Sequence, residues 1–367
     1  MSLKRQHFSR ARRPRQPSFH KRLGSRNTVS SSQLETEAVL TRFYTIAGRL
    51  LSFEPADPWA AQATETFLAG FHLAPSPGPD TGQADCRVKV VTGTPPPVPP
   101  HLQVFEVEHG LCHTDGNSYY LDIDESRIIV GPPEARTVSV WLGETWHARH
   151  SVALANVMSY VLQAALRRSA LYDLHAAGVV EPSSGMGVLL IGTSNSGKSS
   201  LTVRLVLSGW RYLSDDMMVL NETSSGVEAR GLRSIFAVSA SVLAGCRLPR
   251  LEEALGATIP SDPNKRRLEP SIVFPNSFAP VCIPAMLCFP VITGEAESRL
   301  ERMEQTEVMT RLIKHCPWSS YDTSAARSHL QVLSRLVRQT VAYRLFAGRD
   351  MLTTARCASD LLISHLN

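Results

Sequence analysis

The spacing of apolar residues divides the chain into a strand-rich part and a later part in which strands and helices alternate. In the first part, alternating or β-branched runs predict short strands at 87–93, 102–110, 118–124, 126–133 and 137–143. Two proline-dense segments, 74–82 and 92–100, are predicted to be loops or polyproline stretches, because proline lacks the N–H that helices and sheet interiors need. This pattern predicts a β-rich N-terminal module over residues 35–150.

The period of the pattern changes at residue 151. Residues 151–170 predict a core-packing helix, with one apolar face formed by Leu154, Met158, Val161, Leu162, Ala165 and Leu166. Further strands are predicted at 185–192 and 342–348, and strands or strand-edge loops at 210–220 and 226–238. Further helices are predicted at 199–209, 328–341 and 351–366. The 328–341 helix has helical spacing at Leu330, Leu333, Leu336 and Val337. Alternation of strand and helix predicts an α/β fold for a second domain, 151–367.

The length and composition are sufficient for two domains, and the excess of basic residues lies in the N-terminal segment. The chain has 367 residues, 43% of them hydrophobic, which is enough for two cores. Nine of the 38 Lys and Arg lie between Lys4 and Arg26, so 29 remain against 33 acidic residues. Residues 1–34 are therefore predicted to be a disordered basic tail. A solvated extension is favoured over a transit segment or a nucleic-acid-binding arm, so nucleic acid is not an expected partner.

The lengths of the apolar runs and the spacing of the cysteines indicate the cellular compartment in which the protein is expected. No apolar run approaches the roughly 18 residues that span a bilayer, which predicts a soluble, cytoplasmic protein without a membrane partner. The seven cysteines form no C-x-x-C pair, and their number is odd. We therefore expect buried thiols in a reducing compartment, with neither a disulfide framework nor a thiolate zinc site.

The most informative stretch is GTSNSGKSS, which fits the phosphate-binding pattern G-x-x-x-x-G-K-[ST] between a predicted buried strand and a predicted helix. In this pattern, loop N–H groups surround phosphate oxygens at the positive end of a helix. Lys198 would reach the β and γ phosphates, and the Ser199 hydroxyl would bind Mg²⁺. The predicted nucleotide-binding residues are Gly192, Thr193, Ser194, Asn195, Ser196, Gly197, Lys198, Ser199 and Ser200. ATP and Mg²⁺ are the predicted cofactors; a glycine-rich turn that binds nothing is the alternative.

Side chains outside this loop offer the remaining chemistry. Asp215 and Asp216 follow the next predicted strand, where one carboxylate could coordinate the cation while the other accepts a proton; a cap or turn is the alternative. His175 lies in an apolar stretch in which a strand would run beside the loop, although such a histidine is often a core residue. Glu228 offers an oxygen ligand for Mg²⁺, and Arg230 a clamp for phosphate or carboxylate; an ordinary surface ion pair between the two is the alternative.

The order and spacing of these features resemble the HPr kinase/phosphorylase family and the wider set of HPr-kinase-like serine kinases. A histidine, the glycine-rich loop, SGWRYLSDD and EARGLRSIFAV follow one another as the family's motifs do, and RRLEPSIVFPNS is similar to a basic segment of the kinase-like relatives. The resemblance covers about residues 171–348. It implies a P-loop core similar to that of HPr kinase and PEP carboxykinase.

The resemblance also implies roles for individual residues. Asp216 stands at the position of the catalytic base, and Glu228 at that of a metal ligand. Asp215, His175 and Arg230 would hold the catalytic geometry, with Lys198 on the phosphates. In the basic segment, Arg266 or Arg267 would approach the phosphate. The sequence departs from the family pattern at Asn195 in the loop and at Arg233, Ser234 and Phe236 in the second motif.

The predicted activity is therefore that of an ATP-dependent serine kinase. The expected acceptor is a serine hydroxyl of a small protein or peptide, including a ribosomally made peptide precursor. The first alternative is an ATP-binding regulatory or accessory protein that transfers no phosphate. A second alternative is a nucleic-acid-associated NTPase that uses the basic tail. Whether the chain forms a homo-oligomer is left open.

Overall fold

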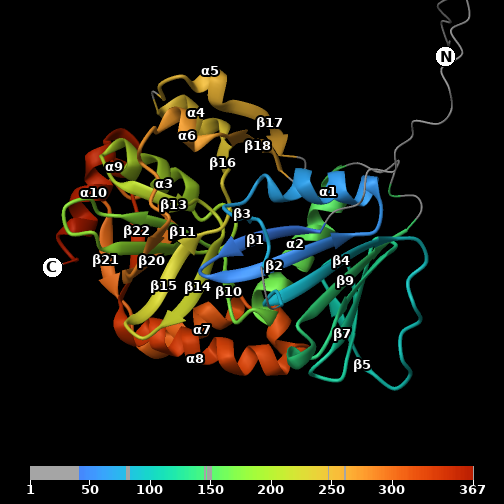
Figure 1. Cartoon of the computed structure of the whole chain (residues 1–367). Coiled ribbons are helices and arrows are strands. Elements are labelled where there is room, and N and C mark those ends of the chain that lie inside the picture. The colour runs from blue at the N-terminus through green and yellow to red at the C-terminus, as the bar shows by residue number, and fades with distance from the viewer. Residues whose placement is uncertain are drawn as a thin grey trace, which may run out of the picture. The chain divides into compact units, whose positions relative to one another are not determined.

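The computed structural model describes residues 41–79, 83–143, 146, 151–246, 248–259 and 262–366. Residues 39–367 form one compact unit, and the described part of it is a mixed α/β structure with four sheets (Figure 1). The predicted basic tail, residues 1–34, lies outside the described residues. The domain boundary near residue 150 stays a prediction.

A nine-stranded sheet occupies the N-terminal part, in the order β3-β1-β2-β4-β9-β8-β7-β6-β5. All five strands predicted in this part are present. The nine are β1 (Arg42–Ile46), β2 (Arg49–Pro55), β3 (Ala74–Ser76), β4 (Cys86–Thr92), β5 (Gln103–Val107), β6 (Gly110–Thr114), β7 (Tyr119–Ile123), β8 (Ser126–Val130) and β9 (Thr137–Leu142). The prediction of a loop over 74–82 was wrong for the three residues of β3. This strand lies at the edge of the sheet, where proline is tolerated.

A six-stranded sheet forms the centre of the C-terminal part, in the order β13-β11-β12-β20-β22-β21. Its strands are β11 (Ala176–Val180), β12 (Gly187–Ile191), β13 (Arg211–Ser214), β20 (Pro284–Ile292), β21 (Arg299–Arg302) and β22 (Val341–Ala347). β12, β20 and β22 are parallel, and β11 is antiparallel to both β12 and β13. β13 therefore runs in the same direction as β12.

Two smaller sheets complete the C-terminal part. One has the order β10-β14-β15-β19, with β10 (Tyr172–Leu174), β14 (Met218–Thr223), β15 (Gly226–Gly231) and β19 (Val281–Cys282). The other has the order β16-β18-β17, with β16 (Phe236–Ser239), β17 (Leu255–Ile259) and β18 (Asp262–Leu268). The predicted segments 210–220 and 226–238 thus each divide into two strands that belong to different sheets.

Helices occur in all four segments where the apolar pattern predicted them, and five of the α-helices in the described residues were not predicted. They are α1 (Pro58–Leu68), α2 (Ser151–Arg168), α3 (Lys198–Leu207), α4 (Ala240–Gly245), α5 (Leu251–Ala254), α6 (Pro270–Val273), α7 (Gln305–Lys314), α8 (Thr323–Gln339), α9 (Asp350–Thr353) and α10 (Ala355–Ile363). The predicted helix 351–366 is interrupted at Thr354. In α8, Leu330 is 38% exposed and does not share the buried face with Leu333 and Leu336.

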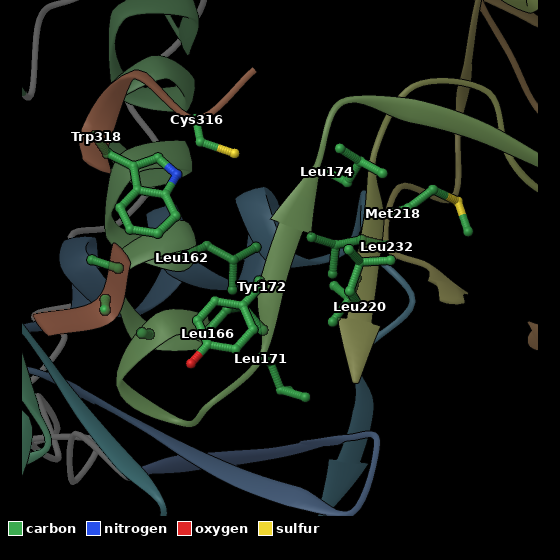
Figure 2. Packing of buried hydrophobic residues seen from close by; sticks show 14 of the residues in the cluster. Leu162, Leu166, Leu171, Tyr172, Leu174, Met218, Leu220, Leu232, Cys316 and Trp318 are labelled. Carbon is green, nitrogen blue, oxygen red and sulfur yellow. The ribbon is translucent and has the colours of Figure 1, made fainter. Parts of the chain in front are cut away.

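Apolar packing joins the N-terminal sheet to the C-terminal part through α2. This helix packs against β4, β8 and β9 of the nine-stranded sheet and against β10 of the four-stranded sheet. Leu162 and Leu166 of α2 lie in one cluster with Tyr172 and with Trp318, which precedes α8 (Figure 2). The same cluster continues into both sheets, so residues on both sides of position 150 share a core.

A buried ionic network reinforces this junction at the end of α2. Arg168 donates to both carboxylate oxygens of Asp322, at 3.1 and 2.9 Å, and to the carbonyl oxygens of Gly131 and Asn117, both at 2.9 Å. Arg167 pairs with Asp173 at 3.2 Å and stacks on the Trp318 ring. The Asp322 side chain is fully buried, so its charge depends on these guanidinium groups.

The burial of the cysteine thiols agrees with the expectation drawn from their number and spacing. All seven cysteines are free thiols, and six of them are buried. Among the described residues, no helix is both long enough and apolar enough to cross a membrane.

Candidate nucleotide site

Three neighbouring strands of the six-stranded sheet bring the glycine-rich loop, His175, Asp215 and Asp216 to one edge. β12 ends at Ile191 and leads into the glycine-rich loop, residues 192–197. β13 runs in the same direction and is followed directly by Asp215 and Asp216. His175 precedes the antiparallel β11, whose first residue, Ala176, pairs with Ile191. Residues far apart in sequence therefore meet where these strands begin or end.

The backbone of the loop has the left-handed residues that a tight phosphate-binding turn needs. Asn195 has φ 64° and Gly197 has φ 98°. Gly197 is the N-cap of α3, a ten-residue helix whose first residue is Lys198. A Cβ on Gly192 would lie only 2.5 Å from the Ser196 hydroxyl oxygen, so a side chain at this position would displace the loop. The loop thus lies at the positive end of a helix, as predicted.

Lys198 is 6% exposed and turns back into the loop. Its ammonium group donates to the carbonyl oxygens of Gly192, at 2.7 Å, and Thr193, at 3.0 Å, and contacts His175 Nε2 at 3.1 Å. These three acceptors match the three N–H donors of an ammonium group. Burial lowers the Lys198 pKa from its usual value, against the opposing effect of nearby Asp216.

His175 connects Lys198 to Asp216. Its Nδ1 lies 3.2 Å from Asp216 Oδ1, while its Nε2 faces the Lys198 ammonium. Because an ammonium group can only donate, Nε2 must accept, and the ring proton is on Nδ1, which donates to Asp216. Burial lowers the His175 pKa, which favours this neutral ring. The structure therefore aligns a cation, a neutral imidazole and a carboxylate.

Asp215 is fully buried beside this line of groups. Its Oδ2 accepts from the Ala237 backbone N–H at 2.8 Å, whereas Oδ1 is buried without a hydrogen-bond partner among the described residues. Burial, followed by the charge of Asp216, raises the Asp215 pKa to about 7, although a hydrogen bond with the Ser199 hydroxyl lowers it. A buried carboxyl oxygen with no partner is costly unless a ligand completes its contacts.

The oxygen atoms around Asp215 suit a magnesium ion that is bound partly by phosphate. Asp215 supplies a buried carboxylate oxygen that has no other partner among the described residues, and the nearby Ser199 hydroxyl lowers the Asp215 pKa. Mg²⁺ prefers such oxygen ligands and usually keeps phosphate and water oxygens in its remaining positions. Among the described residues, no group of three or more His, Cys, Asp or Glu side chains is arranged to hold a metal alone.

The structure adds three basic side chains that sequence analysis did not assign to the site. Lys265 of β18 contacts the Ser194 hydroxyl of the loop at 3.3 Å. Arg233 influences the pKa values of both His175 and Asp215 through its charge. His315, which follows α7, has its ring centroid 6.0 Å from that of His175. Lys265 and Arg233 therefore add positive charge near the loop, whereas burial lowers the pKa of His315 and favours its neutral form.

The basic segment before α6 contacts the loop through a residue other than those predicted. Arg266 donates twice to the carbonyl oxygen of Gly256, at 3.1 and 3.0 Å, while Arg267 is exposed. Their neighbour Lys265 makes the contact with the loop. Lys265 and Arg266 are adjacent on β18 and point to opposite faces of the strand, which accounts for the contact being made by Lys265 and not by Arg266.

Glu228 and Arg230 lie on β15, in the four-stranded sheet, and they pair with each other at 3.1 Å. Arg230 lines a surface cleft of about 720 Å³ together with Phe71, His72 and Phe278. Among the described residues, neither side chain forms a hydrogen bond or ion pair with the glycine-rich loop. The chain that follows β15 still lies close to the site. The N–H of Leu232 donates to the carbonyl oxygen of Met217, which is the residue after Asp216.

Comparisons with known proteins give little beyond this geometry. No model of a known protein family matches the chain, and no curated protein sequence matches it. Among solved structures, an HPr(Ser) kinase/phosphatase from Coxiella burnetii aligns with 53% of this chain and 89% of its own, at 13% identity and a TM-score of 0.27. A TM-score of 0.27 does not establish a shared fold. Any conclusion about function therefore depends on the geometry around residues 192–216.

Proposed function

We propose that this chain is an ATP-dependent kinase of the HPr-kinase-like type that phosphorylates a serine hydroxyl of a small protein or peptide. The observation that supports it most is the line from Lys198 through His175 to Asp216, at the end of a glycine-rich loop and beside buried Asp215. Phosphoryl transfer requires mainly positioning and charge, and these groups offer both.

In this proposal, separate groups of the chain bind the phosphates and the metal ion. Loop N–H groups and Lys198 bind the phosphates, for which Lys198 exchanges its contacts with Gly192 and Thr193 for phosphate oxygens. Ser199 and Asp215 hold Mg²⁺, which neutralises phosphate charge when it is bound. Lys265 adds a cation at Ser194.

Asp216 accepts the proton of the attacking hydroxyl. Its Oδ1 is engaged by the Nδ1–H of His175, which fixes the carboxylate and leaves Oδ2 to accept the proton. At 31% exposure, the Asp216 side chain is open enough to meet an acceptor, whereas Asp215 is not. This difference in burial supports assigning the base to Asp216 and the metal to Asp215.

Calorimetry on the full chain tests the binding half of the proposal. Lys198→Ala should weaken Mg·ATP binding about 100-fold or more, since it removes the buried cation from the phosphates. Lys89→Ala, which removes an exposed lysine from β4, is the matched control and should bind like the wild type. Equal affinity of Lys198→Ala and wild type would refute the nucleotide site.

A transfer assay tests the catalytic half. Asp216→Asn should retain Mg·ATP affinity within about threefold but lower phosphate transfer from labelled ATP by about 10²–10⁴-fold, because an amide accepts no proton. Suitable acceptors are serine-containing peptides and small proteins encoded beside this chain's gene. An ATP-binding regulator without transfer activity predicts instead that the wild type labels none of them and that Asp216→Asn changes nothing.

A further inference from the structure

Ile292 is an apolar side chain whose exposure stands out because of its position. It is 64% exposed and follows Val291, which is 40% exposed, at the end of β20. Single exposed apolar residues are common on protein surfaces and need no explanation by themselves. Ile292 is of interest because it lies beside the glycine-rich loop.

β20 extends past the end of the strand that leads into the glycine-rich loop. The two strands are parallel, and Leu190 of β12 pairs with Cys288 of β20. β12 ends one residue later, at Ile191, whereas β20 continues to Ile292 and pairs there only with β22. The last residues of β20 therefore run alongside the loop.

The Ile292 side chain reaches the loop at the residue before Lys198. A Cβ placed on Gly197 would lie 3.4 Å from Ile292 Cγ1 and 3.5 Å from Cδ1. A different part of the loop, at Ser194, meets the cation of Lys265. The rim of the loop thus has a charged contact at Ser194 and an aliphatic side chain beside Gly197.

We propose that Ile292 is the apolar platform for the nucleoside part of the bound nucleotide, an inference that rests on the proposed function. In open α/β sheets, ligands lie beyond the carboxyl ends of parallel strands, and β12 and β20 both end here. With the phosphates held by the loop and Lys198, the base and ribose extend across the rim. Ligand sites typically place apolar side chains against such flat groups.

This contact has a distinct chemical consequence. An isoleucine side chain has no hydrogen-bond donor or acceptor, so it can cover the face of a base without reading its polar edge. Ile292 should therefore add affinity for ATP and GTP to the same extent. It should add nothing for a ligand that has phosphates but no nucleoside.

The test compares three ligands in the presence of Mg²⁺: ATP, GTP and inorganic tripolyphosphate. Calorimetry on the full chain should show that Ile292→Ser weakens ATP and GTP binding by about tenfold each, the scale of losing part of one buried aliphatic side chain. Tripolyphosphate binding should stay within about twofold. Ile292→Val should recover most of the nucleotide affinity, because it retains the apolar surface.

Ile283→Ser is the matched control. Ile283 is 52% exposed and immediately precedes β20, so it lies at the opposite end of that strand from the loop. This variant should bind all three ligands as the wild type does. Unchanged nucleotide binding by Ile292→Ser would overturn the inference, and so would an equal loss of tripolyphosphate binding, which would mean that Ile292 only shapes the loop. Wild-type protein that binds none of the three ligands would overturn the proposed function as well.

Discussion

Asp215 is the residue at which folding and the proposed function oppose each other most directly. It is fully buried, and one of its oxygens has no hydrogen-bond partner among the described residues. Burial raises its pKa to about 7, well above the 3.8 of an exposed aspartate. The ionised form is thus disfavoured in the folded chain, which is the pattern expected where a ligand rather than the protein completes the contacts.

This carboxyl should make the stability of the protein depend on pH. Between about pH 4 and pH 7 the unfolded chain releases the Asp215 proton while the folded chain retains it, so this residue lowers stability as pH rises. Asp215→Asn lacks this effect. Relative to wild type, the variant should gain about 2 kcal/mol of unfolding free energy between pH 5 and pH 8. Urea unfolding at both pH values measures it; a constant difference would refute the raised pKa.

Lys265 and its neighbours allow a second prediction about single residues. Lys265→Ala should weaken Mg·ATP binding about three- to tenfold, because it removes the cation at Ser194, and should leave thermal stability almost unchanged. Arg267→Ala removes an exposed cation from the same strand and should bind Mg·ATP normally. The opposite result in calorimetry would favour the sequence-based assignment of the phosphate contact to Arg266 or Arg267.

At the scale of elements, local patterns were predicted well and pairings between distant segments were not. The buried strand, the loop and α3 follow one another in sequence, so apolar runs and glycine positions sufficed to predict them. The motif that contains β15 implied roles for Glu228 and Arg230 at the nucleotide; in the structure they lie on a strand of another sheet and pair with each other. Sheet membership depends on long-range pairing, which sequence spacing does not encode.

The additional site residues were missed for related reasons. His315 follows α7 and lies in no recognisable motif, so only the packing of the helices brings it to His175. Lys265 immediately precedes the basic segment that the sequence indicated, and the face of the strand that each residue occupies depends on its register with β16. A basic segment can therefore be predicted before the contacting side chain can.

The junction between α2 and α8 gives a prediction about stability. Asp322→Ala should lower the free energy of unfolding by about 3–5 kcal/mol, because it leaves buried Arg168 without its carboxylate partner. Glu252→Ala, an exposed carboxylate on α5, is the control and should change it by less than about 0.5 kcal/mol. Chemical denaturation measures both; a loss below 1 kcal/mol for Asp322→Ala would show that the network contributes little.

At the scale of the whole molecule, the basic tail separates the proposed kinase from a nucleic-acid-associated NTPase. Deleting Met1–Asn27 removes nine positive charges. We expect the melting temperature and peptide phosphorylation to change little, since every proposed site residue lies after Leu174. Nucleic-acid binding by the full chain should be weak, nonspecific and steeply dependent on salt. Sequence-selective binding that disappears on truncation would instead support the NTPase.

The shared helix α2 also limits how this fold can be recombined with others. Arg168 needs carbonyl oxygens from the nine-stranded sheet on one side and the N-cap carboxylate of α8 on the other. A chimaera joined near residue 150 would give α2 a foreign sheet and leave guanidinium donors facing an apolar surface. A transplantable unit from this chain must therefore contain the sheet, α2 and the start of α8 together, so an exchange of segments succeeds only when all three come from the same parent.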